Sequence, residues 1–265
     1  MLPRVNLVRS DQGEFLAFGT DVLSNQLFHS GAWEKNLLSL GLLLVQRLEA
    51  PLVLDIGANL GAFTVPMAER IQRAGGQVIA FEPQRIVYYQ LCGNIFLNRL
   101  ENVHAINKAV GDQDAVIQIP KPDYARLRNI GAFSIEEKYR KLNGTQAAMS
   151  STTESVPIIT LDSFEVFKPP ALIKLDVEGY ELNVLQGATN FLRRNDYPPI
   201  LFEAWSESWF AEEKTRLLDF TRSLGYEIIA MGGYDHLAQH AAKPLVRVDK
   251  ASDGTLHLFP VTASD

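Results

Sequence analysis

The sequence predicts an α/β fold in which a mostly parallel, doubly wound sheet carries helices on both faces. Short apolar runs typical of buried strands alternate along the chain with stretches of helical spacing. The first core run, residues 52–56, leads into a helical pattern through a glycine-rich segment at 57–61. Acidic residues follow the ends of several runs, and sheets of this kind bind their ligands at that edge. These observations place a candidate binding site at the carboxyl ends of the strands.

The composition is that of one α/β domain with additions. The 265 residues are 46% hydrophobic and carry a formal net charge of −6, with no block of lysine and arginine. Tight binding to nucleic acid or to an anionic membrane is therefore disfavoured. Cys92 is the only cysteine, which excludes a disulfide framework and a cysteine-based metal site. Its helical surroundings predict a buried apolar thiol.

The longest apolar stretch, Leu37–Leu48, is predicted to be a core helix. It is interrupted by polar residues and has about half the length that a membrane span requires. The first residues lack the charged-then-apolar pattern of a signal sequence. We therefore expect a cytoplasmic protein without a membrane span.

Two regions are expected along the chain. Residues 1–50 are predicted to be a lead-in and cap helix packed on the core, and residues 51–265 the main domain. Residues 120–155 follow no regular pattern and end in a Ser/Thr-rich tail, which is typical of a lid or a disordered segment.

The individual elements follow from apolar spacing and turn residues. The predicted strands are 5–8, 14–18, 52–56, 77–81, 103–110, 115–119, 156–161, 171–175, 199–202, 226–231 and 255–261, and the predicted helices are 37–48, 63–70, one beginning at Pro83, 180–192 and 211–224. A turn or helix is expected to begin at Thr20–Asp21. Asp162 is interpreted as the N-cap of a short helix that ends before Pro169, and Gly225 as the C-cap of the helix before it.

The glycine-rich turn carries the first functional signal. It reads Asp55-Ile-Gly-Ala-Asn-Leu-Gly61, and its glycines remove Cβ atoms that would block a ligand or crowd the turn. A strand that turns into a helix presents backbone N–H groups and a positive helix end. Asp55 would repel a pyrophosphate but could accept from an ammonium group. The turn therefore favours a cationic cofactor without a diphosphate, such as S-adenosylmethionine, and it lacks the G-x-G-x-x-G spacing of a nicotinamide-dependent oxidoreductase.

Acidic residues stand just past successive predicted strands. A row of carboxylates along one edge is costly to bury unless it binds something, although each acid alone could cap a helix. Glu82 follows Gly61 by about twenty residues, the spacing at which an acid accepts from ribose hydroxyls. Ala109 and Val110 are placed to line an adenine site. The acids of the row are Asp55, Glu82, Asp112, Asp176 with Glu178, and Glu203.

The second functional signal is the segment 174–181. If the strand stays extended, its period of two points Lys174, Asp176 and Glu178 to one side. Methyl transfer to an alcohol requires removal of the hydroxyl proton or a metal that lowers its pKa. Asp176 or Glu178 could be the base, and Asp176 with Glu203 could hold a divalent ion. The alternative is a structural ion pair with Lys174 plus a helix cap.

Two histidines are candidates for the edge of this site. His29, with Trp33 and Glu34, precedes the glycine-rich turn and could fold over the cofactor, although a histidine beside aromatics is more often simply packed. His236 follows a predicted strand and could lie at the edge of the site.

These motifs resemble the FkbM family of S-adenosylmethionine-dependent methyltransferases over residues 20–240. The likeness is carried by the segments 55–61, 81–83, 109–112, 156–162, 172–181 and 184–188, and by Gly31-Ala-Trp-Glu34. The resemblance implies a seven-stranded class I methyltransferase sheet whose last strand runs antiparallel, with Glu34 helping to close the cofactor pocket. It also implies O-methylation of a hydroxyl on a sugar, a glycan or a polyketide-type compound. His236 departs from the asparagine usual at that position.

The sequence therefore predicts an S-adenosylmethionine-dependent O-methyltransferase with a small-molecule or glycan acceptor. Alternatives are an N-methyltransferase, an oxidoreductase and a non-catalytic cofactor-binding scaffold. The predicted catalytic residues are Asp176, Glu178 and Glu203, the predicted cofactor-binding residues are Glu34, Asp55, Gly57, Asn59, Gly61, Thr64, Glu82, Ala109, Val110 and Asp176, and the residues considered for a metal are Asp176 and Glu203.

Overall fold

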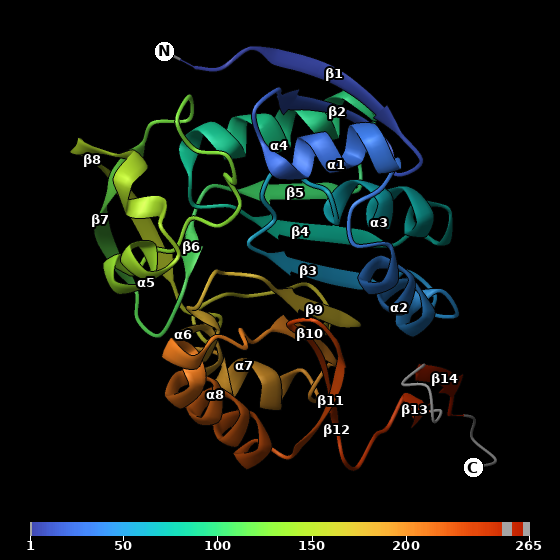
Figure 1. The fold of residues 1–265 in the computed structure, drawn as a ribbon. Helices are drawn as coiled ribbons and strands as arrows, with labels where there is room; N and C mark the ends of the chain where they lie inside the picture. The colour runs from blue at the N-terminus through green and yellow to red at the C-terminus, as the bar shows by residue number, and fades with distance from the viewer. Residues whose placement is uncertain (1, 251–255, 262–265) are drawn as a thin grey trace.

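A seven-stranded sheet organises the molecule (Figure 1). The computed structural model describes residues 2–250 and 256–261. The strand order is β11-β12-β10-β9-β3-β4-β5, and every neighbouring pair is parallel except the two pairs that β12 makes. The expected mostly parallel α/β sheet, with its last strand antiparallel, is confirmed. The strands are β3 (Leu52–Ile56), β4 (Gln77–Phe81), β5 (Val103–Ile106), β9 (Leu172–Leu175), β10 (Ile200–Glu203), β11 (Tyr226–Gly232) and β12 (Asp235–His240).

Helices cover both faces of this sheet because its central strands are apolar on both sides. On β3, Val53 packs into one apolar cluster while Leu52 and Leu54 pack into another, as the alternation of side chains along a strand requires. The first cluster includes residues of α2 (Lys35–Val45) and α3 (Thr64–Ile71). The second includes residues of α6 (Glu181–Gln186), α7 (Thr189–Arg194) and α8 (Ala211–Ser223).

The N-terminal residues form a hairpin, whose second strand packs on α4 (Arg85–Leu97), and a helix that packs on the first strand of the hairpin. Strands β1 (Val5–Ser10) and β2 (Gly13–Phe18) pair antiparallel, as the sequence predicts. Asn94 of α4 accepts from the backbone N–H of Leu16 in β2, at 2.6 Å. Helix α1 (Val22–Ser30) begins after Asp21, whose carboxylate accepts from the N–H of Ser24. The helix α2 ends at Val45, three residues before the predicted end.

The predicted strand 103–110 is two strands in different sheets. β5 ends at Ile106, and β6 (Ala109–Val110) belongs to a small sheet of order β6-β8-β7 with β7 (Ala115–Pro122) and β8 (Met149–Ile159). The chain turns at Asn107, whose side-chain amide donates to the carbonyls of Glu82 and Pro83. This turn carries Ala109 and Val110 out of the central sheet.

The region 120–155 is more regular than predicted. It contains α5 (Glu137–Leu142) and the 3₁₀ helix η2 (Thr145–Ala148), and its Ser/Thr-rich tail is the first half of β8. The tail pairs antiparallel with β7, so that Gln118 lies opposite Ser155. Because most side chains of this half-strand face solvent, it lacks the apolar signal by which strands are predicted.

Two predicted helices differ in the structure. The segment after Asp162 contains no helix, and the Asp162 carboxylate instead accepts from the N–H of Phe191, 2.6 Å away at the start of α7. The predicted helix 180–192 is divided into α6 and α7 at Gly187. A Cβ at Gly187 would lie 2.0 Å from the carbonyl oxygen of Gly111, just after β6, so only glycine fits at the point between the two helices.

The C-terminal part contains β12, which the sequence analysis missed. Gly232 and Gly233 have positive φ angles and turn the chain from β11 into β12. Polar residues at both ends of β12 leave only a short apolar centre, too short to be recognised as a strand from the sequence. Gly225 adopts a φ of +89° just after α8, as predicted for a helix end. β14 (Leu256–Pro260) pairs with β13 (Val246–Lys250) in a separate sheet, and Thr255 of the predicted strand 255–261 lies outside the described residues.

Three smaller features complete the fold. Cys92 is half-buried in α4 rather than fully buried as predicted. The 3₁₀ helices η1 (Gln72–Ala74) and η3 (Ser208–Phe210) extend the segments around α3 and α8. Within residues 2–250 and 256–261, every helix falls short of the length and apolar character that a bilayer crossing needs.

Candidate active site

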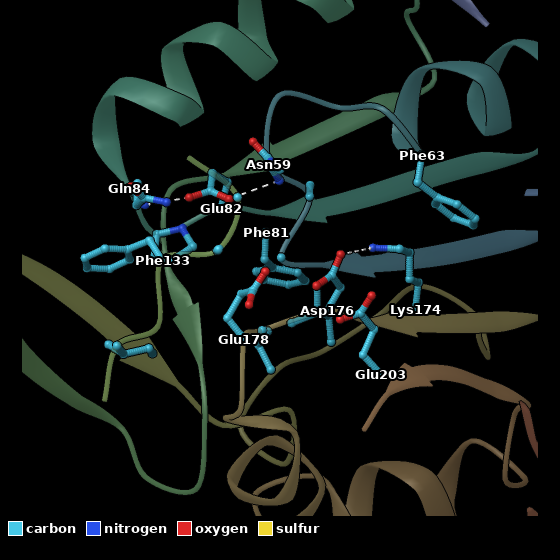
Figure 2. Close-up of a pocket in the computed structure, with 18 of the residues that line it drawn as sticks. Asn59, Phe63, Phe81, Glu82, Gln84, Phe133, Lys174, Asp176, Glu178 and Glu203 are labelled. Carbon is cyan, nitrogen blue, oxygen red and sulfur yellow. Dashed lines mark hydrogen bonds and ion pairs between the residues drawn. The ribbon is translucent and has the colours of Figure 1, made fainter. Parts of the chain in front are cut away.

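A cavity of about 420 Å³ opens at the carboxyl ends of β3, β4, β9 and β10 (Figure 2). Ligand sites of open α/β sheets are found at this edge, where connections leave the strands. The cavity is lined by residues 57–59, 82–84 and 176–178, by Glu203 and residues of the loop after it, and by residues 131–133 between β7 and β8. The region 120–155 therefore supplies one wall of the cavity.

The glycine-rich turn after β3 brings backbone close to the cavity. Gly57 has a φ of +86°, and a Cβ there would lie 1.8 Å from the carbonyl oxygen of Asp176. Only glycine fits this crossing of two strand ends. Asn59 has a φ of +52°, which asparagine tolerates better than most residues, and its N–H donates to Oε2 of Glu82 at 3.0 Å.

Glu82 is held in place by two backbone groups. Its Oε1 accepts from the N–H of Gln84 at 2.8 Å, and its Oε2 accepts from Asn59. Burial raises the pKa of Glu82 to about 8, although these two hydrogen bonds oppose the shift. A carboxylate oxygen has two lone pairs, so each oxygen can still accept from a ligand hydroxyl.

Lys174 is the buried cation of the site. Its Nζ lies 3.0 Å from Oδ2 of Asp176 and 3.8 Å from Oδ1 of Asp55. Burial alone would lower the pKa of Lys174, but the carboxylates of Asp176 and Asp55 raise it above its ordinary value. Lys174 therefore stays charged and links the strand tips of β3 and β9.

Asp55 lies behind the cavity wall and not on it. It is fully buried, accepts from Oγ1 of Thr64 at 2.5 Å and faces Lys174. Burial raises the pKa of Asp55, while Lys174 and Thr64 oppose the shift. Gly61 is also behind the wall, where an added Cβ would meet Leu91 at 2.9 Å. The cation beside Asp55 in this structure is Lys174, and Asp55 lies outside the residues that line the cavity, so its contact with a ligand ammonium stays a prediction from the sequence.

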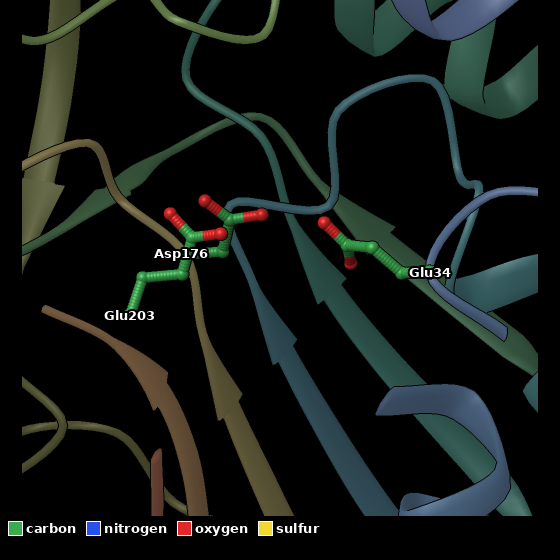
Figure 3. A group of neighbouring side chains, drawn as sticks. All are labelled: Glu34, Asp176 and Glu203. Carbon is green, nitrogen blue, oxygen red and sulfur yellow. The ribbon is translucent and has the colours of Figure 1, made fainter. Parts of the chain in front are cut away.

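Three carboxylates converge on the cavity from separate elements (Figure 3). Glu34 precedes α2, Asp176 follows β9 and Glu203 ends β10. One carboxylate oxygen from each residue lies within 4.8 Å of the other two. Burial, with repulsion from Asp176, raises the pKa of Glu203 to about 10. Burial also raises the pKa of Glu34 to about 7, although Lys174 opposes the shift. Such a cluster binds either protons or a cation.

The chain after β9 does not stay extended. The prediction that Lys174, Asp176 and Glu178 point to one side required an extended chain through residue 178. Glu178 has a φ of +54° and Gly179 a φ of +92°, so the chain turns at these residues. Oε1 of Glu181 accepts from the N–H of Val177 at 3.0 Å and holds this turn. Glu178 still lines the cavity, and burial with repulsion from Asp176 raises its pKa.

The structure thus gathers most of the predicted residues. Those that line the cavity are Glu34, Gly57, Asn59, Glu82, Ala109, Val110, Asp176, Glu178 and Glu203. Those that lie outside its lining are Asp55, Gly61, Thr64, Asp112, His29 and His236. Asp112 is exposed and accepts from the hydroxyl of Tyr180, so it does not belong to the acidic row. His29 is exposed beside Phe28, and His236 stacks on Phe202.

Sequence reasoning missed the loop after β10. Trp205, Glu207 and Trp209 all line the cavity, as does Tyr234 from the turn before β12. The signal was the alternation of tryptophan and glutamate directly after a strand that ends in an acid. Phe133 and Asn143, from the region 120–155, also line the cavity and had no recognisable motif.

Comparison with known proteins agrees with the resemblance seen in the motifs. A family model described as the methyltransferase FkbM domain matches residues 55–228. "Methyltransferase 1" of Beauveria bassiana (strain ARSEF 2860) is 27% identical over 146 residues, 51% of this chain and 57% of that protein. "Methyltransferase sdnD" of Sordaria araneosa is 26% identical over 194 residues, 64% of this chain and 72% of that protein.

Among solved structures, methyltransferase FkbM from Methylobacillus flagellatus KT aligns with a TM-score of 0.46 and 17% identity. The alignment covers 74% of this chain and 46% of that one. The chain spans less than two thirds of the length of the Beauveria relative and of this structure.

Proposed function

This chain belongs to the FkbM methyltransferase family, and on this premise we propose that it is an S-adenosylmethionine-dependent O-methyltransferase. The proposed acceptor is a hydroxyl of a sugar, a glycan or a related small molecule. The observation that carries the proposal is the group of buried carboxylates around Lys174, in a cavity at the carboxyl edge of a parallel sheet. Residues 51–265 are the proposed catalytic domain, with 120–155 as its lid.

The cavity residues fit the chemistry of the methyl donor. Glu82 accepts from the two ribose hydroxyls, and Ala109 with Val110, buried in β6, contact the adenine. Gly57 lets the turn after β3 pass close to the carbonyl of Asp176, which brings the ends of β3 and β9 together at the cavity. Asp176 Oδ2 accepts from Lys174, so Glu34 and the other oxygen of Asp176 are the acceptors offered to an ammonium group. Asp55 and Thr64 act from behind by holding Lys174 in place.

When bound, S-adenosylmethionine supplies an electrophilic methyl group next to these acids. Asp176 accepts the proton of the acceptor hydroxyl, and Glu178 and Glu203 hold that hydroxyl in line. The pKa of about 10 means that Glu203 carries a proton in the ligand-free protein at neutral pH, and burial with repulsion from Asp176 also raises the pKa of Glu178. A cationic ligand bound nearby lowers the pKa of these carboxyl groups and favours their ionised form, which accepts hydrogen bonds from the acceptor hydroxyl.

The carboxylates Glu34, Asp176 and Glu203 could also hold a divalent ion. Lys174, however, already places a positive charge 3.0 Å from Asp176. We therefore assign the cationic role in this cluster to Lys174 and to the donor, and no step to a metal.

Two measurements test the proposal. Calorimetry is expected to show binding of S-adenosylmethionine and S-adenosylhomocysteine and no binding of NAD. Radiolabelled donor, incubated with a panel of glycosides, polyols and matched amines, is expected to label a hydroxyl. Label found only on amines would instead establish N-methylation. Binding without transfer to any member of a broad panel would favour a non-catalytic scaffold.

A further inference from the structure

The loop between β10 and α8 forms a separate part of the cavity wall that the donor site does not use. Trp205, Glu207 and Trp209 line the cavity from this loop, and Tyr234 lines it from the turn between β11 and β12. The turn and the loop are joined, because the N–H of Ala204 donates to the carbonyl of Tyr234 at 2.9 Å. This group of four residues is called the aromatic–acid wall below.

The aromatic–acid wall lies at the opposite end of the cavity from Glu82. Glu82 follows β4, and Glu203 ends β10, and β3 and β9 lie between these two strands. Neighbouring strands are about 4.8 Å apart, so the two strand tips are separated by about 14 Å. A ligand whose ribose is held at Glu82 and whose charged end lies near Asp176 leaves the region beyond Glu203 free for the acceptor.

Glu207 and Tyr234 together present acceptors only. The hydroxyl of Tyr234 donates to Oε1 of Glu207. Oε2 of Glu207 is buried and has no hydrogen-bond partner among the residues that the structure describes. A buried carboxylate oxygen without a donor is unfavourable, and a ligand that brings an O–H group to it removes this penalty. With its proton engaged, the Tyr234 oxygen is also left as an acceptor.

The tryptophans beside Glu207 form a rigid apolar surface. The Trp205 and Trp209 rings lie 5.4 Å apart at 68°, and Tyr139 packs edge-on against Trp205 at 5.5 Å. Tyr139, Trp205 and Phe210 are buried in one cluster, which fixes the orientation of Trp209 packed against it. An aromatic surface next to a carboxylate suits a ring that is apolar on one face and carries hydroxyls at its edge.

We propose that the aromatic–acid wall binds the acceptor, and that the acceptor is an uncharged ring with neighbouring hydroxyls, such as a hexopyranoside or a cyclitol. The inference rests on the proposed O-methyltransferase function and specifies which side of the cavity selects the substrate. Glu207 and Tyr234 accept from one pair of hydroxyls while Trp209 contacts the ring. An acceptor carrying phosphate or carboxylate is disfavoured, because the Glu207 carboxylate belongs to this wall.

The test uses the full chain saturated with S-adenosylhomocysteine, and a panel of methyl hexopyranosides and inositols. Binding is followed by saturation-transfer NMR, and methyl transfer by labelled donor. Glu207→Gln is expected to raise the acceptor KM by about tenfold or more, because a charged hydrogen bond is lost. Tyr234→Phe, which removes only the hydroxyl, is expected to raise the acceptor KM by a smaller factor. Trp209→Ala is expected to weaken saturation transfer to the protons of the acceptor ring.

The matched control is Glu212→Gln, an exposed position on α8 outside the cavity lining. All variants are expected to keep the S-adenosylhomocysteine affinity of the parent, which also shows that they are folded. An unchanged acceptor KM in both Glu207→Gln and Tyr234→Phe would overturn the inference while leaving O-methylation intact. Binding of S-adenosylhomocysteine with no glycoside or inositol bound would overturn it too. Failure of the proposed function would give a different result: the protein would not bind S-adenosylhomocysteine, or it would transfer no methyl group to any oxygen.

Discussion

The backbone N–H of Asn59 donates to Oε2 of Glu82 at 3.0 Å, which joins the turn after β3 to the tip of β4. The bond links the glycine-rich motif to the proposed ribose-binding acid, although the two residues are separated by 23 positions in the sequence. Glu82 thereby orients the turn as well as any ligand that the turn holds. Substitution of Glu82 is expected to change both the conformation of the turn and the affinity for the ligand.

Glu82→Ala is expected to weaken binding of S-adenosylhomocysteine by about ten- to a hundredfold. The variant loses the acceptors for two ribose hydroxyls and leaves the N–H groups of Asn59 and Gln84 without their partner. Isothermal titration calorimetry measures the change. Glu69→Ala, at an exposed position of α3, is the control and is expected to bind as the parent does. Equal affinity in the two variants would remove Glu82 from the cofactor site.

Asp176→Ala is expected to lower kcat by about a hundredfold or more, the usual contribution of a general base. Most of the affinity for S-adenosylhomocysteine should remain, since Glu82, Ala109 and Val110 still contact the nucleoside. Steady-state kinetics with labelled donor and calorimetry separate the two effects. Turnover like that of the parent would exclude Asp176 as the proton acceptor.

Gly57→Ala is expected to destabilise the protein by about 2–4 kcal/mol and to abolish cofactor binding. The new Cβ would stand 1.8 Å from the carbonyl oxygen of Asp176, and backbone there cannot move aside easily. Gly144→Ala isolates the strain of a positive φ, because Gly144 has a φ of +81° with nothing within 4 Å of its Cβ position. Its cost should be only about 1 kcal/mol. Urea denaturation of both variants measures the difference, and equal losses would contradict the steric argument.

The ligand-free protein is expected to lose stability as pH rises from about 5 to about 9. Burial raises the pKa of Glu82 to about 8 and that of Glu34 to about 7, above their ordinary value of 4.5. A carboxyl with a raised folded-state pKa binds its proton more tightly when folded. Its stabilisation is therefore complete below about pH 4.5 and is lost as pH rises through the folded-state pKa.

Thermal denaturation across this pH range checks the expectation, and Glu82→Gln should flatten the profile. Stability that rises with pH over the same interval in the parent protein would be inconsistent with these raised pKa values. Affinity for cationic S-adenosylmethionine is expected to rise with pH in the same window, because the ionised carboxylates bind it better.

Methyl transfer is expected to continue in the presence of EDTA. Lys174 supplies the positive charge beside Asp176, so the acid cluster has no obligatory need of an ion. Activity that disappears with EDTA and returns with Mg²⁺ or Mn²⁺ would show instead that Glu34, Asp176 and Glu203 hold a metal.

The glycine-rich turn and Glu82 could be predicted from the sequence because their signal is local. The turn needs glycine at position 57 for steric reasons, and Glu82 directly follows an apolar strand. Asp55 also follows an apolar strand, but β3 is buried on both faces, and no local feature of the sequence shows that Asp55 lies behind the cavity lining beside Lys174. Asp162 was misread for a related reason, since the helix start that it caps lies 29 residues further along the chain.

The aromatic–acid wall could not have been assembled from the sequence alone. Glu207 and Tyr234 are 27 residues apart and meet only because β10 and β12 are neighbours. This pairing requires β12 (Asp235–His240), and the polar residues of β12 conceal the apolar alternation by which a strand is predicted from sequence. Contacts of this kind follow from topology rather than from spacing.

The central claim is that carboxylates at the strand tips hold the methyl donor at this edge of the sheet. A crystal structure of the complex with S-adenosylhomocysteine tests it most directly. The account predicts ribose hydroxyls on Glu82, adenine against Ala109 and Val110, and the amino group beside Glu34 and Asp176. A ligand bound away from these residues, with Glu82 and Asp176 untouched, would contradict it.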